Sequence, residues 1–317
     1  MQPNIGEIHH LRCLAHLINL IEKKITKFTK ITTGNETQSG SQFIDMDEDD
    51  ETNDIVFSDS DSGLIKNFKS LVEKCRKISA LFHQSSIFPV ILTEKQKAAG
   101  VKQNRLLQDV PTRWNSKFLM LDRYSEQNVM VNEVLRDRRL NNKHEHLTFN
   151  NNEIKSLNDS VKILQPFYDA TVELSGIKYP TLSIAMPIVL SLRESLAANE
   201  NDTMFSLVLK KFFVHYMEQY LAKYNILNEI LLITATFLDV RTKFFVRCTE
   251  SRKKEYLNAS KMYIKRVVDD FPVDLKIKLG LNDTSNSQRN VNLSQSTDAC
   301  RSNRLQYLDF TRDYENK

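Results

Sequence analysis

Apolar residues recur at helical spacing along most of the chain. Between residues 8 and 30 they alternate steps of three and four positions, which places them on one stripe of a helix. The members of this stripe are Leu11, Leu14, Ile18, Ile21, Ile25 and Phe28. The same periodicity returns from Leu64 to Phe82 and, after an irregular connection, from Ser116 to Arg139. The pattern therefore predicts an amphipathic helix in each of the three segments.

The second half of the chain continues this helical pattern. Further helices are predicted at residues 152–177, 180–198, 203–224 and 250–271, with a short one near residues 92–99. The run from Ile230 to Val240 fits a strand or a helix, and its helical neighbours favour a helix. Pro166 lies inside the predicted helix at 152–177 and has no backbone N–H donor, so a kink or break is expected near it.

Two polar stretches interrupt the pattern. In residues 31–62 small polar residues give way to an acidic run, and few apolar side chains remain to offset the entropy of ordering. After Leu281 large apolar residues almost disappear, as in a linker or tail. Four segments are therefore predicted: an N-terminal helical segment at 1–31, a disordered acidic insertion at 32–62, a helical domain at 63–281, and a polar tail at 282–317.

The composition supports a mainly α fold. The 317 residues include 7 glycines and 7 prolines, whereas an average chain of this length holds about 22 and about 16. Folds that turn sharply at short intervals, or that bind phosphate in glycine-rich loops, need more of both. This argues against β-sandwiches, Rossmann domains and P-loops.

The cysteines and the apolar runs indicate the compartment. The four cysteines lie far apart without a C-x-x-C pair, which argues against a disulfide scaffold and a four-cysteine zinc site. The first ten residues do not resemble a signal peptide. The most apolar run, Ile230 to Leu238, is too short to cross a membrane. We therefore expect a soluble intracellular protein without a membrane partner.

Charge is segregated along the chain. Residues 45–61 hold nine acids and no Lys or Arg, so the remainder has 44 basic against 31 acidic residues and a net charge of +13. A body this basic suits a polyanionic partner, although a merely soluble basic protein has the same balance. We also expect the acidic run to compete transiently with the phosphates of such a partner, or else to be an inert solvated insertion.

Two short motifs are candidates for chemistry. Cys13 and His16 stand one turn apart on the first helix, as half of a metal site or as a nucleophile and base, but a packed helix pair is favoured because further ligands are missing. In the run DVPTRWNS, Arg113 and Trp114 stand at a helix entrance. Trp offers a stacking face for an unpaired base and Arg a grip on phosphate, while a buried Trp with Arg across it is the structural alternative.

Catalytic acids are not evident. Two-metal phosphoryl chemistry needs three acids that converge on two cations about 4 Å apart. Here the acids cluster in residues 45–61 or scatter over helix surfaces, which is typical of solvated charge. We predict no catalytic residue, no metal and no cofactor.

Four motifs in order resemble those of hAT-superfamily transposases and of the zinc-finger BED proteins domesticated from them. CLAHLINL (13–20) resembles the family's C-x-x-H-x-x-N-L helix, and LLQDVPTRWNSKFLMLDR (106–123) resembles its DV-x-TRWNST-x-x-ML-x-R signature. Weaker matches follow at 164–183 and at ATFLDVRTKFF (235–245), where relatives usually have ATFLDPRYK. Val240 and Thr242 depart from that pattern.

The resemblance implies a fold and a set of site residues. In the family a large helical insertion interrupts an RNase H-like domain, so this chain would be nearly all bundle-like helical insertion, with residues 5–12 a remnant of the last strand. Trp114 matches a tryptophan that stacks a flipped base, and Arg113, Cys13 and His16 match its active-site surroundings. Lys117 and Arg123 are added as phosphate contacts.

The resemblance also implies which functions are absent. The family's catalytic aspartates would precede Met1, and its catalytic glutamate and dimerisation region would follow Lys317; a BED finger is absent as well. We therefore expect a nuclear, DNA-binding fragment that is not an enzyme and that self-associates, if at all, through surfaces meant for the missing core. The alternatives are an incomplete gene model of an active transposase and a helical protein-interaction scaffold.

Overall fold

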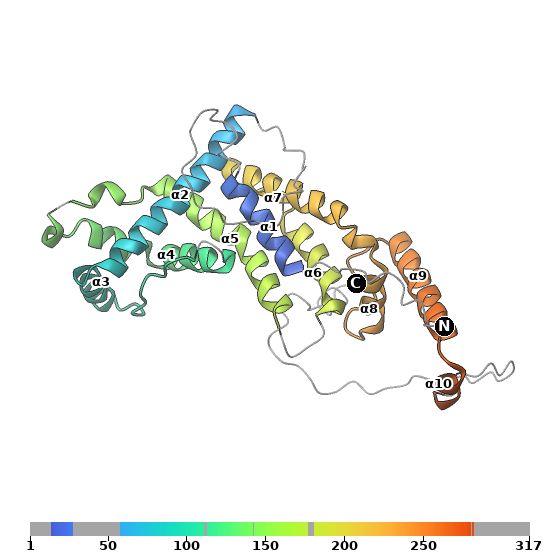
Figure 1. Cartoon of the computed structure of the whole chain (residues 1–317). Coiled ribbons are helices and arrows are strands. Elements are labelled where there is room, and N and C mark those ends of the chain that lie inside the picture. Colours follow the sequence, from blue (N-terminus) through green and yellow to red (C-terminus); the bar gives the residue numbers. More distant parts are fainter. Residues whose placement is uncertain are drawn as a thin grey trace, which may run out of the picture. The chain divides into compact units, whose positions relative to one another are not determined.

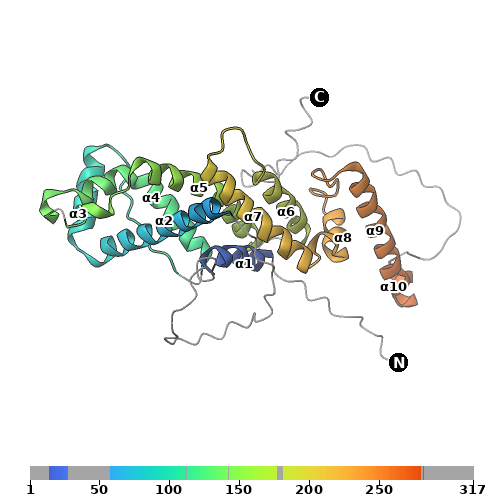
Figure 2. The same cartoon turned by 90° about the horizontal axis from the view of Figure 1, so that it is seen from above.

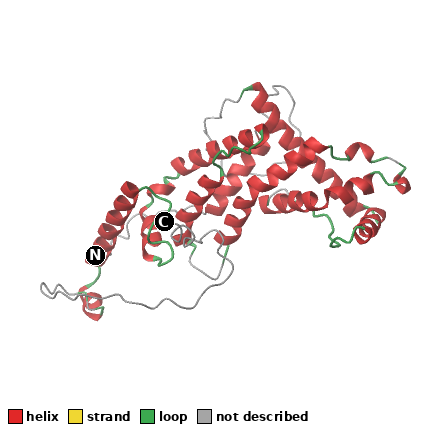
Figure 3. Ribbon diagram, turned by 180° about the vertical axis from the view of Figure 1, so that it is seen from behind, coloured by secondary structure: helices red, strands yellow, loops and turns green. Residues whose placement is uncertain are grey.

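The described residues of this chain form helices joined by short loops. The computed structural model describes residues 14–27, 58–110, 113–141, 143–176, 181–279 and 281 (Figures 1 and 3). Among them, β pairing is limited to an isolated bridge between Val110 and Arg113. The helices are α1 (Leu14–Lys27), α2 (Asp59–Gln84), α3 (Ile87–Ala98), α4 (Trp114–Leu135), α5 (Asn151–Leu174), α6 (Leu182–Ser195), α7 (Met204–Lys223), α8 (Ile230–Leu238), α9 (Glu250–Asp269) and α10 (Val273–Lys278). Three 3₁₀ turns are η1 (Arg138–Leu140), η2 (Glu145–Leu147) and η3 (Ile226–Asn228). The predicted mainly α fold is confirmed.

The helices divide into two compact units. Unit 1 comprises residues 1–176 and 192–224, and unit 2 comprises residues 177–191 and 225–317. The sequence predicted one helical domain over 63–281. The division arises because the helices after Tyr224 pack with one another and with the first part of α6. Local periodicity is the same in both units and carries no sign of such a boundary.

Unit 1 is a bundle centred on α5. Helix α5 packs against α1, α2, α4 and α7, and α2 also packs against α3, α4 and α7. Figure 2 shows α2, α4, α5 and α7 side by side. The interior is rich in aromatic residues, with Phe167 and Phe213 centred 5.0 Å apart and Phe212 and Tyr216 4.6 Å apart. The aromatic face of α7 therefore lies in the core, where Phe205, Phe212, Tyr216 and Tyr220 are all buried.

Helix α2 shows how the sequence pattern leads to packing. Its buried apolar residues follow the predicted stripe: Ile65, Phe68, Leu71, Val72, Cys75, Ile78 and Phe82. Each such side chain stabilises the fold by about 1.5–3 kcal/mol when fully buried. The helix begins at Asp59, inside the segment predicted to be disordered, because the Ser58 side chain accepts a hydrogen bond from the Asp61 N–H at 3.2 Å. Acids in this first turn also complement the helix dipole.

Pro166 and Pro187 lie in the interiors of α5 and α6, and neither one ends its helix. Helix α5 continues through Pro166, contrary to the break that the sequence allowed. In α6, Pro187 cannot donate to the Ser183 carbonyl one turn earlier. That carbonyl instead accepts from the Thr236 hydroxyl at 3.2 Å. A residue of α8 thus satisfies the group that Pro187 leaves without a helical partner.

Several predicted features fall outside the described residues. They are the strand remnant at 5–12, most of the acidic insertion, and the polar tail from residue 282 onward. Of the helices that are described, including the apolar α8, none combines the length and the hydropathy required to span a bilayer.

Candidate nucleic-acid interface

Val110 and Arg113 close a turn at the start of α4. The Arg113 N–H donates to the Val110 carbonyl at 2.9 Å, which closes the turn. The Ser116 hydroxyl lies 2.8 Å from the Val110 nitrogen, from which it accepts, and 2.6 Å from the Arg113 carbonyl, to which it donates. The side chain that fastens this helix start is Ser116, while Thr112 lies outside the described residues.

Trp114 faces the interior of unit 1. Its side chain is 6% exposed, and its indole Nε1 donates to the Thr171 hydroxyl of α5 at 3.3 Å. Phe118 lies one turn later, with its ring centre 6.3 Å from the indole, and stacks on Tyr168 of α5 at 4.7 Å. The indole face predicted to stack on an unpaired base is therefore covered in this structure. The buried tryptophan that the sequence left open as the alternative is the observed arrangement.

Arg113 is placed differently from its neighbour. It is exposed at the N-terminal boundary of α4, and its side chain makes no capping hydrogen bond. A guanidinium in this position is available to a phosphate from solution. Of the two adjacent residues, Arg113 is thus the one whose placement agrees with direct DNA contact.

The acid before this turn has a structural partner. Asp109 has a side chain only 1% exposed and accepts from Arg76 of α2 at 2.9 Å and 2.6 Å, in a two-pronged ion pair. Such bidentate pairs fix geometry as well as charge. The pair ties the turn to α2, so the charge of Asp109 is balanced within the fold.

The two lysine and arginine positions predicted as phosphate contacts are engaged in the fold. Lys117 is 9% exposed, which leaves little of its side chain to a ligand. Arg123 donates to the Arg105 carbonyl at 3.1 Å and pairs with Glu126 at 3.0 Å. Arg123 therefore links the loop before α4 to the helix, and Lys117 is largely enclosed by the fold.

The C-x-x-H pair is only partly described. His16 is exposed on α1, between Leu14 and Leu17, which are buried. Cys13 lies outside the described residues. Within the described part of the chain, no group of three or more His, Cys, Asp or Glu side chains is arranged to hold a metal ion.

The motif at 235–245 builds the core of unit 2. Met186, Ile233, Phe245 and Tyr256 form its buried cluster. Asp239 accepts from the Ser183 hydroxyl and from the Arg241 guanidinium, both at 2.6 Å. These hydrogen bonds, that with Arg241 above all, hold the pKa of Asp239 well below its ordinary value. The buried Thr242, which departs from the family pattern, donates to the carbonyl of Thr236 at 2.9 Å.

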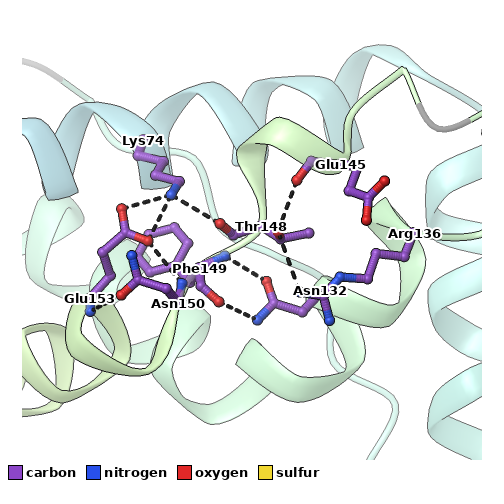
Figure 4. Close-up of polar contacts among 8 residues, drawn as sticks. All are labelled: Lys74, Asn132, Arg136, Glu145, Thr148, Phe149, Asn150 and Glu153. Atoms are coloured by element: carbon purple, nitrogen blue, oxygen red, sulfur yellow. Dashed lines mark hydrogen bonds and ion pairs between the residues drawn. The ribbon is translucent and has the colours of Figure 1, made fainter.

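Sequence reasoning missed a polar cluster between α4 and α5 (Figure 4). Asn132 holds Phe149 by both backbone groups: its Nδ2 donates to the carbonyl at 3.2 Å, and its Oδ1 accepts from the N–H at 2.9 Å. Lys74 of α2 donates to the Thr148 carbonyl at 3.0 Å and to Glu153 at 2.7 Å. The same ammonium lies 4.6 Å from the centre of the Phe149 ring.

The sequence gives no indication of the long-range contacts in this cluster. Lys74 and Glu153 are 79 positions apart, and neither belongs to a motif. The part with a local signature is the capping box, in which Asn150 and Glu153 satisfy each other's backbone N–H at the start of α5. The cluster fixes both ends of the segment that connects α4 to α5.

Comparison with known proteins agrees with the motifs. Residues 11–163 match the family model of the ZBED1 RNase-like helical domain. Over 253 residues, or 80% of this chain, the sequence is 25% identical to zinc finger BED domain-containing protein 4 of Homo sapiens. The chain spans 18% of the length of that relative. The predicted resemblance to hAT-type transposases and BED-type proteins is confirmed, and the matched model is a helical domain, as unit 1 is.

Proposed function

We propose that this chain binds DNA, as the helical part of a transposase-derived protein that acts in the nucleus. The observation that carries the proposal is the match of residues 11–163 to a ZBED-type helical domain. The positive charge of the chain outside residues 45–61 supports it, because phosphate contacts supply most of the affinity of non-specific DNA binding.

Within this proposal the two residues of the TRW motif have different roles. Arg113 is exposed and contacts a phosphate. Trp114 is buried against α5 and acts as a positioning residue that fixes the turn carrying Arg113. A His16 contact with DNA fits its exposure on α1, and a Cys13 contact rests on the motif alone.

Binding, and not strand transfer, is the activity that we assign to this stretch. The match is to a helical domain, and the motifs imply that the family's catalytic acids belong to other parts of the full-length relatives. Incubation of the chain with nicked and intact duplex in Mg²⁺ or Mn²⁺ should leave both uncut. Reproducible cleavage, lost when an acid outside residues 45–61 is replaced, would contradict this assignment.

A DNA titration at two salt concentrations tests the proposal. Fluorescence anisotropy of a labelled 20-base-pair duplex should show binding at 50 mM salt that weakens by about 10³-fold or more at 200 mM if six or more phosphates are contacted. A helical protein-interaction scaffold is the second candidate, favoured by the burial of Trp114. A chain that is fully helical by circular dichroism yet fails to bind DNA at 50 mM salt would favour the scaffold.

A further inference from the structure

The connection between α4 and α5 is built as a rigid support. Its described residues, 136–141 and 143–147, are here named the basic loop. Its base is held by the cluster around Asn132 and Lys74, and its middle by Leu140, which is 9% exposed. The ring of His144 packs edge-on against Phe88 of α3, with centres 5.3 Å apart. In Figure 1 the loop lies at the same end of unit 1 as α3.

One acid and one arginine of the basic loop, Asp137 and Arg139, form ion pairs within the protein. Asp137 accepts from the Arg139 side chain and backbone, each at 3.0 Å, and lies 3.8 Å from Lys95. These contacts lower the pKa of Asp137 to about 2. Arg139 pairs in addition with Glu94 of α3 at 2.8 Å. The charge of Asp137 is therefore balanced by groups that belong to the loop and to α3.

Three further cations of the basic loop point to solvent. Arg136, Arg138 and Lys143 are exposed. The contact drawn for the Arg136 side chain is a long one, 3.5 Å to the Thr148 hydroxyl. Three cations face solvent on a loop whose geometry other residues determine. A cation on a fixed backbone binds an anion with less loss of conformational entropy than one on a mobile loop.

The chemistry of the loop selects the anion. Its sequence, RDRRLNNKHEHL, has no Phe, Tyr or Trp with which to stack a base. Outside the internal pairs its charged side chains are the three exposed cations and one exposed carboxylate, Glu145, so this charge is net positive. Arg and Lys side chains are hydrogen-bond donors of the kind that contact phosphate oxygens. We propose that Arg136, Arg138 and Lys143 bind the phosphate backbone of double-stranded DNA, as a contact surface separate from Arg113. This inference rests on the proposed DNA-binding function and names further residues that contact the DNA.

A pair of charge-matched triple variants tests the inference in the full chain. The loop variant is Arg136→Gln/Arg138→Gln/Lys143→Gln. The control is Lys66→Gln/Lys77→Gln/Lys155→Gln, whose lysines are exposed on α2 and α5 of the same unit. Both variants lose three positive charges, so general electrostatic attraction changes equally in the two. Circular dichroism and thermal melting establish that both keep the parent's fold.

The expected result is a loss confined to the loop variant. It should bind the labelled duplex about tenfold more weakly or worse at 50 mM salt, and its slope of log K against log salt should fall by about 2–3, at roughly 0.9 per phosphate contact. The loss should be the same for two duplexes of unrelated sequence, because phosphate carries no sequence information. The control should keep the parent's slope and lose less than about threefold in affinity.

The possible failures are distinct. If the parent binds DNA but the two variants weaken binding equally, or the loop variant binds like the parent, the basic loop is not the contact surface and the proposed function stands. If the parent itself does not bind DNA at 50 mM salt, the proposed function fails and the inference with it. If the loop variant loses binding to duplex but the parent binds poly-glutamate equally well, the surface is a general site for acidic polymers and the assignment to DNA is overturned.

Discussion

The indole nitrogen of Trp114 donates a hydrogen bond to the Thr171 hydroxyl, 3.3 Å away, and so joins the first residue of α4 to α5. The Thr171 hydroxyl itself lies 2.9 Å from the carbonyl of Phe167, to which it donates. The tryptophan of the TRW motif is therefore part of a chain of hydrogen bonds in the core of unit 1. The residue that meets solvent at the same helix start is Arg113.

Truncation of Trp114 should therefore act on stability first. Trp114→Ala removes a large buried side chain, which typically costs about 3–5 kcal/mol, and leaves the Thr171 hydroxyl without its donor. Urea unfolding followed by circular dichroism measures the loss. Thr171→Val is the matched control for the hydrogen bond, with an expected cost of about 1 kcal/mol. A fully stable Trp114→Ala chain that binds DNA with unpaired bases about 1–3 kcal/mol more weakly would instead indicate base stacking.

Arg113→Ala should weaken DNA binding and leave stability nearly unchanged, the opposite of what is expected for Trp114→Ala. Because its side chain is exposed and makes no capping bond, the free energy of unfolding should change by less than about 0.5 kcal/mol. Affinity should fall for single-stranded and double-stranded DNA alike, since a phosphate contact is common to both. Anisotropy titrations with both DNAs, at one salt concentration, measure this. Unchanged affinity for both would remove Arg113 from the interface.

The sequence could predict the helices and their buried faces, because these depend on local periodicity. The stripe from Leu64 to Phe82 became the buried face of α2, because residues three and four apart share one face of a helix. The predicted helix from Ser116 ran four residues too far. Helix α4 ends at Leu135 because Asp137 accepts from the Arg139 N–H and begins a separate 3₁₀ turn.

Contacts between distant positions could not be predicted in the same way. Trp114 and Thr171 are 57 positions apart, and no feature of the sequence at either position indicates that the two side chains are in contact. The motif indicated that a tryptophan and an arginine stand at a helix start, but whether the indole turns inward depends on α5 packing beside it. The basic loop was missed because its cations were assigned to the end of a helix, and the Asn132 and Lys74 contacts that shape it are non-local.

Asp239 provides a test of the unit 2 core through pH. Asp239→Asn should destabilise the protein by about 1–3 kcal/mol at pH 7, because the charged hydrogen bonds to Ser183 and Arg241 are lost. The folded-state pKa lies below the unfolded one, so this contribution is present above the ordinary carboxyl pKa and declines as the pH falls. Thermal melts of both chains at pH 7 and pH 3 should show a smaller difference in Tm at pH 3. A difference that grows at pH 3 would contradict the assigned direction.

The acidic run at residues 45–61 overlaps the start of α2 at Asp59, and this overlap determines which deletion is informative. The sequence predicted a disordered insertion at 32–62, and a deletion of residues 35–60 would lie wholly inside it. Ser58 caps α2, and Asp61 pairs with Lys211 at 3.6 Å, so that deletion would cost the cap about 1 kcal/mol and shorten the helix. The informative deletion is residues 35–56, which keeps Ser58 and the first turn.

That deletion removes eight acids and should tighten DNA binding at low salt if the run competes with phosphates. The screening length falls from about 30 Å at 0.01 M salt to about 8 Å at 0.15 M, so the advantage should shrink as salt rises. The control replaces all eight acids, Glu36, Asp45, Asp47, Glu48, Asp49, Asp50, Glu51 and Asp54, with Asn or Gln at unchanged chain length. Tighter binding in both variants assigns the effect to charge; tighter binding in the deletion alone assigns it to excluded volume. Parent-like affinity in both at low ionic strength means that the run is an inert insertion.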